Sequence, residues 1–507
     1  MDVEVEAAPA EAHPNDGADS PGAPRILGVD AWWAAGAAVT ALAAVTVFIS
    51  IGEKSFWLDE GYSYAFAQSS WSQLWDIVSS SQANMGIYYG VLHGWLTSGD
   101  GESYVRSLSA LFTIGTVPVV FLLGRRLVGP SAGVVAGLLL ALNAFSVHYG
   151  QEARGYSLVM LLCALASLLF LRAMDSPAAL RWTAYAVVMA LAVYAHFFAG
   201  FVLIAHGLGW LSARKRAGIT KPLVAFVAVG FLVAPLIVFV ATNQGNQIGW
   251  IPEPTFDGLW TASKEFAGGG AVLLLAYLVA AGWGAVVAYR EFGREQRYAL
   301  VVLLGWLLIP ILGSFGLSYA KPIFVTRYLI VALPPLILLA AFGIVRPPVT
   351  RLVAVPAAAV LVALSVASLS DWYSDPPQDD WRGAARFIET YTQPDSGLIV
   401  IPPKVRKPLE YYLARDPEAA GNAPHPIYPP EPLGTYPFKS AKLKPLHEEL
   451  ATRAENYQQT WVVLAYGSPA ARRQALKTIT QRFPLLQQAQ FKNVAVLLFD
   501  TSSPVSS

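Results

Sequence analysis

The dominant feature of the sequence is a series of long apolar runs that fills most of its first 370 residues. A helix that crosses a bilayer needs about 20 mainly apolar residues, and we identify eleven candidate runs. Their approximate cores are residues 32–52, 106–124, 130–149, 155–173, 182–199, 200–213, 222–242, 269–289, 299–318, 326–345 and 352–370. Only 14% of all residues are charged, against about 25% in soluble domains. The sequence therefore predicts an α-helical polytopic membrane protein.

The cations are distributed unevenly between the two sets of connections that join these runs. One set carries closely spaced cations: Arg125, Arg126, Arg172, Arg181, Arg214, Lys215, Arg216, Lys221, Arg290, Arg294, Arg297, Arg346 and Arg351. The other set carries only scattered ones: Lys54, Arg106, Arg154, Lys264, Lys321 and Arg327. Cytoplasmic loops are enriched in Lys and Arg, so we predict a multi-pass plasma-membrane protein with a cytoplasmic N-terminus and an extracytoplasmic C-terminal part.

Composition divides the chain into three parts. Residues 1–27 are acidic, rich in Ala and Pro and poor in aromatics, which is typical of a disordered tail, here cytoplasmic. Residues 28–371 form the membrane module. Within it, AFAQSSWSQLWDIVSS and ANMGIYYGVLHGWL have apolar residues at helical spacing but are too short or too polar to span. They predict interfacial helices at about 62–98.

The last part, residues 372–507, begins with the polar, Pro-rich linker DWYSDPPQDDW. LIVIPP, WVVLAY and VAVLLFD are typical of buried strands, and helical patterns lie between them. We predict a small extracytoplasmic α/β domain. The single cysteine, Cys163, excludes an internal disulfide and a Cys-based metal site. A net charge of +1 gives no indication of a nucleic-acid partner.

Two adjacent carboxylates, Asp59 and Glu60, follow the first apolar run in the motif WLDEGYSY. Asp59 has two interpretations. An Asp at the start of an interfacial helix caps free backbone N–H groups well. A carboxylate held among aromatic residues at the membrane edge is also suited to act as a general base toward a hydroxyl.

The segment HYGQEARGY, between the third and fourth runs, contributes further candidates. His148 and Glu152 are four residues apart and share one face of a helix. A metal site would need more ligands than this pair provides. Glu152 and Arg154 could form a structural ion pair, or Arg154 could present its always-charged fork to a phosphate.

Two outer loops complete the candidate site. In AKPIFVTRYL, Lys321 and Arg327 are either snorkelling cations or, together with Arg154, a phosphate-binding group. In NQIGWIPEPTF, Trp250 either belongs to an aromatic belt at the interface or lines a sugar site with His196 of YAHFF.

The order of these motifs resembles a known family. A first span followed by WLDE, two surface helices, SYVRSLSALFTIGTVPVVFLLGRRLVG, HYGQEARGYSL and FVTRYLIVALPPL, over residues 30–380, is similar to bacterial GT-C membrane glycosyltransferases. The nearest type is family 39, which includes protein O-mannosyltransferases and aminoarabinose transferases. Asp59 matches that family's first-loop catalytic acid, with Glu60 beside it. The chain departs from the pattern at ANMGIYY, where many relatives have a His-Pro-Pro-like segment. The resemblance therefore does not define which residues form the acceptor side of the pocket.

The resemblance implies a GT-C fold and an inverting transfer of a sugar from a polyprenyl-phosphate donor. The acceptor would be an extracytoplasmic glycan, lipid or protein. We assign Asp59 and Glu60 to catalysis and Arg154, Lys321 and Arg327 to the donor phosphate. The expected substrate pocket comprises Tyr62, Tyr88, His148, Glu152, Tyr156, His196, Trp250 and Tyr328. A monophosphate donor requires no metal, although the chemistry is compatible with a divalent cation near Asp59 or Glu152. The alternatives are a lipid or sugar transporter and a catalytically inactive membrane scaffold.

Overall fold

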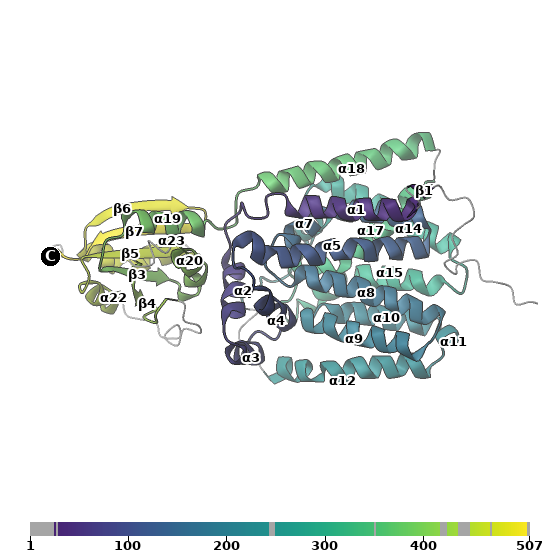
Figure 1. Ribbon diagram of the computed structural model, residues 1–507, viewed down its shortest axis with the longest axis horizontal. Helices are drawn as coiled ribbons and strands as arrows, with labels where there is room; N and C mark the ends of the chain where they lie inside the picture. Colours follow the sequence, from purple (N-terminus) through teal and green to yellow (C-terminus); the bar gives the residue numbers. More distant parts are fainter. Residues whose placement is uncertain are drawn as a thin grey trace, which may run out of the picture.

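The computed structural model describes residues 25–26, 29–242, 249–348, 351–415, 423–433, 447–466 and 469–503. A bundle of long helices makes up most of the molecule, and a smaller domain built on a five-stranded sheet lies beyond one end of it (Figure 1). The predicted tail, residues 1–27, falls outside the described residues except for Arg25–Ile26 (β1), which pairs with Val29–Asp30 (β2).

Each of the eleven predicted spans corresponds to one helix or to two or three consecutive helices. They are α1 (Ala31–Phe48), α5 (Glu102–Leu127), α6 (Pro130–Ala141) with α7 (Ala144–Gly150), α8 (Tyr156–Asp175), α9 (Ala179–Ala195), α10 (Ala199–Ser212), α12 (Thr220–Thr242), α14 (Ala271–Glu291), α15 (Arg297–Leu308) with η1 (Ile309–Gly313) and α16 (Ser314–Leu317), η2 (Thr326–Ala332) with α17 (Leu333–Val345), and α18 (Arg351–Ser374). Among the described residues, eight are long and apolar enough to cross a membrane, or nine if the bent pair α6–α7 is one span. The two shorter helices α9 and α10 are also apolar.

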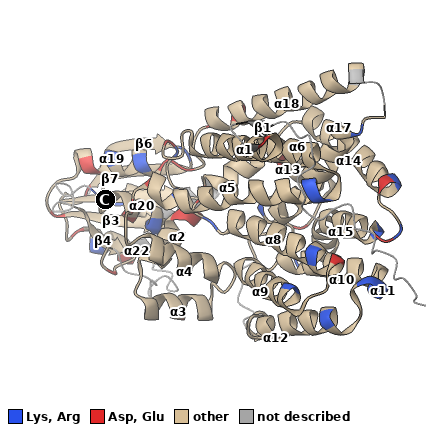
Figure 2. Ribbon diagram, turned by 45° about the vertical axis from the view of Figure 1, so that its right-hand side comes forward, with Lys and Arg blue, Asp and Glu red and all other residues tan. Residues whose placement is uncertain are grey.

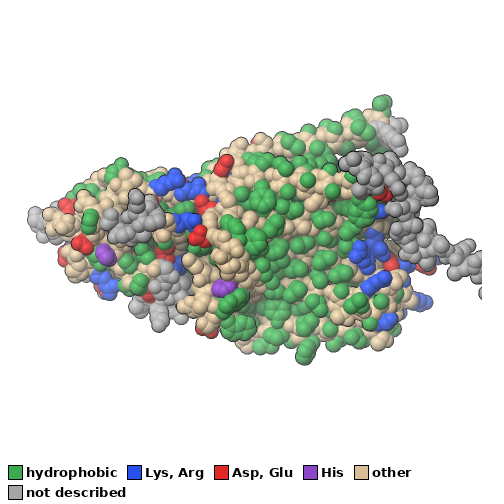
Figure 3. Space-filling view, in the orientation of Figure 1, with side chains coloured by type: hydrophobic (Ala, Val, Ile, Leu, Met, Phe, Trp, Pro, Cys, Tyr) green, Lys and Arg blue, Asp and Glu red, His purple; other side chains and the backbone are tan. Residues whose placement is uncertain are grey.

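Lys and Arg gather at the end of the bundle that is farther from the sheet domain, near α11 (Arg214–Ala217) (Figures 2 and 3). There, Asp175 forms ion pairs with Arg126 and Arg216, and Arg216 also lies 3.2 Å from Glu295. These contacts bring four of the cation-rich connections together. The cation-rich connections of the sequence therefore lie together at the end of the bundle that is farther from the sheet domain.

The bend between α6 and α7, which measures 61°, is centred on Asn143. Its Oδ1 accepts the N–H of Ser146 at 2.9 Å, and its Nδ2 donates to the carbonyl of Ala267, the last residue of α13 (Phe256–Ala267), at 3.1 Å. Because one side chain caps the new helix and binds a neighbouring one, the break is well defined. It directs α7 and the following turn, residues 151–155, toward the start of α8 at the domain-facing end.

Glycines allow α14 and α17 to approach closely. A Cβ on Gly284 would lie 1.7 Å from the carbonyl oxygen of Leu339, and one on Gly343 would lie 2.1 Å from that of Ala280. Small residues at such contacts let membrane helices pack backbone against backbone.

Three short helices lie at the end of the bundle that faces the sheet domain: α2 (Leu58–Gln68), α3 (Trp71–Ser80) and α4 (Gly86–Trp95) (Figure 1). The sequence indicated two helices here. The additional boundary arises at Ser70, whose side chain accepts the N–H of Gln73 and starts α3 with a capping box. On α3, Leu74 and Ile77 are buried whereas Trp71 is 62% exposed, as expected of an interfacial helix.

The C-terminal domain confirms the predicted α/β composition. Its elements are α19 (Trp381–Tyr391), β3 (Ser396–Ile401), η3 (Pro403–Val405), α20 (Arg406–Leu413), β4 (His425–Tyr428), α22 (His447–Ala454), β5 (Gln459–Ala465), α23 (Pro469–Arg482), β6 (Leu485–Phe491) and β7 (Val494–Asp500). The strand order is β4-β3-β5-β7-β6, with β4, β3 and β5 parallel and β7 antiparallel to both of its neighbours. Leu398 belongs to the core that contains Trp381 of α19, whereas its neighbour Ile399 belongs to the core that contains Leu450 of α22, so alternate residues of β3 serve opposite faces.

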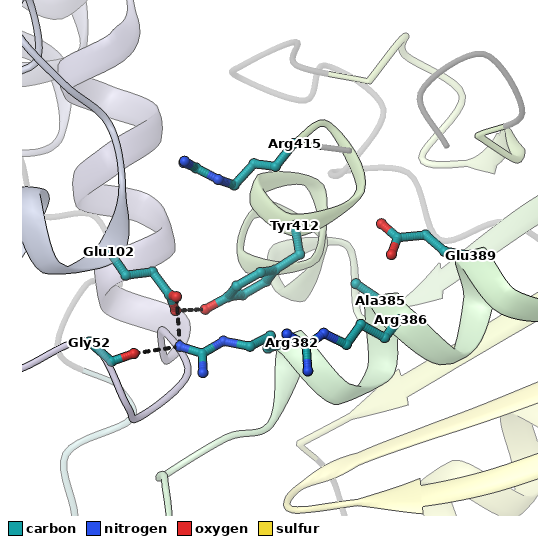
Figure 4. Close-up of a pocket in the computed structure, with 8 residues that line it drawn as sticks. All are labelled: Gly52, Glu102, Arg382, Ala385, Arg386, Glu389, Tyr412 and Arg415. Atoms are coloured by element: carbon teal, nitrogen blue, oxygen red, sulfur yellow. Dashed lines mark hydrogen bonds and ion pairs between the residues drawn. The ribbon is translucent and has the colours of Figure 1, made fainter. Parts of the chain in front are cut away.

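A group of polar side chains fixes the domain to the bundle (Figure 4). Arg382 of α19 donates to Glu102, at the start of α5, at 2.6 Å and to the carbonyl of Gly52 at 2.8 Å. The hydroxyl of Tyr412 on α20 donates to the other oxygen of Glu102. A cavity of about 440 Å³ opens beside them. These bonds connect two helices of the domain to the bundle near the first residues of the WLDE segment.

Candidate functional site

Glu60, in the first turn of α2, is fully buried. Arg106 of α5 donates to both of its oxygens at 2.7 Å, and the N–H of Ala153 donates to one of them at 2.9 Å. Burial raises the pKa of Glu60, and the charge of Arg106 opposes this effect. Because protein donors occupy both oxygens, the geometry gives Glu60 the task of holding the segment in place. Its predicted catalytic role stays a prediction.

Asp59, the adjacent residue, lies between two arginines. Its Oδ2 is 3.6 Å from Nη2 of Arg154 and 3.6 Å from Nη2 of Arg327, and a quarter of its side chain is exposed. It does not cap α2, because the first N–H of the helix, that of Leu58, is accepted by Asp379 instead. The helix-cap interpretation of Asp59 is therefore wrong. Two arginines that are far apart in the sequence therefore meet at the carboxylate of Asp59.

Arg154 is positioned by the surface helices. Its Nη1 donates to the hydroxyl of Tyr89 on α4 at 3.0 Å and to Ser63, one turn beyond Asp59 on α2, at 3.3 Å. The alternative ion pair with Glu152 is not formed, since Glu152 faces His148 at 2.9 Å. Arg154 thus presents a fixed guanidinium group beside Asp59.

Arg327, the second residue of η2, is positioned by aromatic rings. Its guanidinium carbon lies 5.0 Å from the ring centre of Trp250, 5.5 Å from that of Trp57 and 5.8 Å from that of Tyr328. Cation–π contacts of this kind hold an arginine without neutralising its charge. Besides its ion pair with Asp59, Arg327 has an Nε–H without a hydrogen-bond partner among the described residues, which could bind an anion.

His196 and Tyr156 form the buried wall of this site. The His196 ring lies 4.6 Å from the ring of Tyr328, which lies 6.2 Å from the ring of Tyr156. Nδ1 of His196 accepts the N–H of Phe198 at 3.2 Å. The neutral imidazole therefore carries its proton on Nε2, which is a donor.

Several buried polar atoms around Asp59 have no hydrogen-bond partner within the described part of the chain. They are Nε1 of Trp57, Nε of Arg154, the hydroxyl of Tyr156, Nε2 of His196 and Nε of Arg327. Unpartnered buried polar groups are costly and rare in folded proteins. All five carry a hydrogen, so the set is suited to an anion.

A second group lies on the other side of Trp57. His148 stacks on Trp372 at 3.9 Å between ring centres, and Nζ of Lys54 lies 3.3 Å from the Trp372 ring centre. With Trp57 and Glu152, these residues line a cavity of about 390 Å³. Burial lowers the pKa of Lys54 to about 8, and the charge of Asp375 opposes the shift.

Three predicted site residues are not part of either group. Lys321 is exposed and forms no ion pair with a described residue. Tyr62 packs its ring on Phe66, at 5.5 Å. The hydroxyl of Tyr88 bonds to Ser109 at 2.9 Å, behind the site. The residues that the structure does bring together at Asp59 are Arg154, Tyr156, His196, Trp250, Arg327 and Tyr328.

Tyr89 and Trp57 also belong to the site, although the sequence patterns did not predict them. Neighbouring helical residues point about 100° apart, so only one of Tyr88 and Tyr89 can face Arg154, and the sequence does not say which. Trp57 stands in the WLDE motif, and its position between a carboxylate and an arginine-bearing loop only becomes evident in three dimensions.

The prediction that no metal is required, with a divalent cation compatible near Asp59 or Glu152, stays a prediction. The described residues contain no group of three or more His, Cys, Asp or Glu side chains that could hold a metal. At Asp59, the guanidinium groups of Arg154 and Arg327 repel a second cation.

Comparisons with known proteins bear on the fold. Residues 93–241 match the family described as dolichyl-phosphate-mannose-protein mannosyltransferase. The structure is similar to ArnT from Cupriavidus metallidurans in the apo state, with a TM-score of 0.60 and 14% identity over 92% of this chain and 97% of ArnT. The chain has the GT-C fold. A structure of the same ArnT bound to undecaprenyl phosphate gives a TM-score of 0.59, with 14% identity over 93% of this chain and 98% of that one.

A longer GT-C protein shares the architecture. The arabinofuranosyltransferase AftD from Mycobacteria has a TM-score of 0.51 and 15% identity over 92% of this chain, which spans 41% of AftD. A comparison with curated protein sequences finds no match.

Proposed function

We propose that this protein is an inverting glycosyltransferase that moves a sugar from a polyprenyl-phosphate donor to an extracytoplasmic glycan, lipid or protein. The observation that carries the proposal is the position of Asp59 between Arg154 and Arg327. A cation pair for a phosphate and a carboxylate for a hydroxyl are the two chemical groups that such a transfer needs.

The two arginines would bind the donor phosphate. Guanidinium groups match the geometry of phosphate oxygens and keep their charge at any physiological pH. The unpartnered donors of Tyr156 and His196 lie next to them. In the comparison structure, ArnT from Cupriavidus metallidurans binds undecaprenyl phosphate, which supports a lipid phosphate as the ligand of this fold.

Asp59 would act as general base. The oxygen of an acceptor hydroxyl attacks the anomeric carbon of the sugar, and the bond from that carbon to the phosphate oxygen breaks. Asp59 takes the hydroxyl proton, and Arg154 and Arg327 stabilise the charge that remains on the polyprenyl phosphate. Attack from the face opposite the phosphate inverts the configuration. The cavity of about 390 Å³ beside Trp57 offers space for an acceptor. This step requires no metal.

The distribution of charge supports the orientation. Lys and Arg gather at the end of the bundle away from the sheet domain (Figure 3), and such clusters face the cytoplasm. Asp59 and the sheet domain would then lie outside, with the N-terminus inside. A transporter usually places its binding groups near the bilayer midplane, whereas here they lie at one end of the bundle.

The test is transfer by purified protein in liposomes that contain radiolabelled mannosyl or arabinosyl polyprenyl phosphate and a membrane extract as the source of acceptor. The readout is the polyprenyl phosphate released. Asp59→Asn should lower the rate by about 10²- to 10⁴-fold, the contribution of a general base. The matched control, Asp76→Asn, removes an exposed carboxylate on α3 and should retain the rate. Near-normal turnover by the Asp59 variant would overturn the proposal.

A further inference from the structure

The helix that carries Asp59, α2, contacts both the sheet domain and the candidate site. On one face of α2, a Cβ at Gly61 would lie 2.8 Å from Cα of Pro408 on α20, and the ring of Tyr64 lies 4.8 Å from the ring of Tyr411. On another face, Ser63 and Asp59 lie against Arg154. One short helix therefore connects the sheet domain to the candidate site.

Asp379, at the end of the linker, holds the first residue of this helix. Its side chain is fully buried. Oδ2 accepts the N–H of Leu58 at 3.2 Å, and the hydroxyl of Tyr466 donates to the same oxygen. Asp379 forms no ion pair with a cationic side chain of the described residues.

The sheet domain provides the remaining donors to Asp379. Nε1 of Trp381, on α19, donates at 3.2 Å, and Nδ2 of Asn493, in the turn between β6 and β7, donates to Oδ1 at 3.2 Å. Tyr466 follows β5. A buried carboxylate without a cation is unfavourable unless hydrogen bonds compensate it, and here three elements of the domain do so. Its fourth donor is the N–H next to Asp59.

The N-terminus of a helix stabilises a negative charge because its first N–H groups have no partner within the helix. Asp379 satisfies one of these groups from outside α2. The position of α2 then depends on where the sheet domain holds Asp379, and Leu58 transmits this position directly to the adjacent residue.

We propose that Asp379 is a positioning residue for Asp59, through which the C-terminal domain sets the placement of the catalytic helix. The kinetic part of this inference rests on the proposed function. Loss of the Asp379 carboxylate should displace Asp59 more than the phosphate-binding arginines, since Tyr89 also holds Arg154 and Trp250 also holds Arg327. The rate constant kcat should fall by about 10- to 100-fold, as for a small misplacement of a reacting group, and the KM for the donor should change by a smaller factor.

The experiment compares Asp379→Asn with Asp380→Asn. Asp380 is the neighbouring carboxylate in the same linker, and it caps α19 by accepting the N–H of Gly383 at 2.8 Å. Amide hydrogen exchange is measured on both full-length proteins together with kcat and donor KM. In Asp379→Asn, the amides of Leu58–Gly61 should exchange faster while those at the start of α19 keep their protection. Asp380→Asn keeps the cap of α19, because Asn accepts the same N–H as well as Asp does, and it should leave kcat and the exchange at the start of both helices unchanged.

Hydrogen exchange does not depend on the activity, so it judges the placement of α2 even if the proposed glycosyltransferase function is wrong. Tyr466→Phe removes one donor and leaves the Asp379 carboxylate in place, which keeps the test valid if Asp379→Asn does not fold. It should accelerate exchange in the first turn of α2 and lower kcat by a smaller factor. Unchanged exchange and unchanged kcat in Tyr466→Phe and in a folded Asp379→Asn would overturn the proposal.

Discussion

The guanidinium group of Arg106 forms two hydrogen bonds, both 2.7 Å long, with the carboxylate of Glu60 in a place where the two side chains are 4% and 1% exposed. The same guanidinium donates to the carbonyls of Ile51 at 2.9 Å and Lys54 at 2.7 Å. One ion pair therefore joins the loop after α1, the start of α2 and α5. These bonds fix the position of the start of α2, and therefore of the adjacent Asp59.

Removal of one partner of this pair should destabilise the protein strongly. Glu60→Gln leaves Arg106 charged, buried and only partly bonded, and breaking a buried pair in this way costs about 3–5 kcal/mol. We expect a clear fall of the unfolding midpoint, measured by thermal unfolding in detergent. The control is Glu449→Ala, which breaks the exposed pair with Arg453 and should cost at most about 1 kcal/mol. Equal midpoints for the two variants would contradict the supporting role of Glu60.

Arg327→Ala should weaken donor binding. A hydrogen bond to a charged group contributes about 1.5–3 kcal/mol, so the KM for the donor should rise by roughly 10- to 150-fold. Arg327→Lys keeps the charge but loses the planar fork and should show an intermediate KM. Lys264→Ala removes a cation on α13 and serves as the control. A donor KM that is unchanged in Arg327→Ala would return this residue to the role of a snorkelling cation.

Lys54 should react as an unusually acidic lysine. Burial lowers its pKa to about 8, so its neutral, nucleophilic form should become dominant above that pH, whereas a free lysine needs a pH near 10.4. Pulse labelling with acetic anhydride at several pH values, read by peptide mass spectrometry, should give a half-maximal rate near pH 8. The same shift affects stability. Because the unfolded chain binds the Lys54 proton more tightly than the folded protein does, the contribution of Lys54 to the free energy of unfolding increases as the pH rises from 8 toward 10.5. A labelling rate that still rises above pH 9.5 would contradict the burial of this amine.

Gly284→Ala should disrupt the contact between α14 and α17. The new methyl group would overlap the carbonyl of Leu339, which belongs to the backbone and cannot rotate away. Overpacking of this kind costs about 1–3 kcal/mol. Gly282→Ala adds the same methyl group to the same helix where no atom lies within 4 Å, and it should be neutral. The unfolding midpoint in detergent distinguishes the two variants.

The architecture was largely predictable because it depends on the period and length of apolar runs. Membrane helices need about 20 apolar residues, and even the short helices α9 and α10 were visible as runs. The strands β3, β5 and β7 were recognisable because each is a compact apolar segment between turn residues. β6, by contrast, has three Gln among its seven residues (LLQQAQF), lies at the edge of the sheet and gave no such signal.

The candidate site was only partly predictable. Arg154 and Arg327 were identified as charged residues on one side of the membrane, but their common partner depends on the bend at Asn143, which redirects the chain before Arg154. Lys321 and Arg327 are six residues apart and looked equivalent. Only the second lies in η2, among the rings of Trp57 and Trp250.

Asp379 gave no signal, because a carboxylate in a Pro-rich linker is typical of an exposed segment. Its burial results from the docking of the sheet domain, whose residues provide three of its four donors. Contacts across such a boundary depend on the relative placement of two parts, which local sequence patterns do not encode.

The close contact between Gly61 and Pro408 has a consequence for engineering this fold. A chimera that combines the membrane part of one enzyme with the C-terminal domain of another would bring together two surfaces that were shaped separately. If α2 came with the membrane part, the foreign domain would meet it at Leu58, Gly61 and Tyr64 without matching side chains. An active chimera therefore requires the residues of α2 to be transferred together with the domain, so that α2 and the surface of α20 that it contacts come from the same protein.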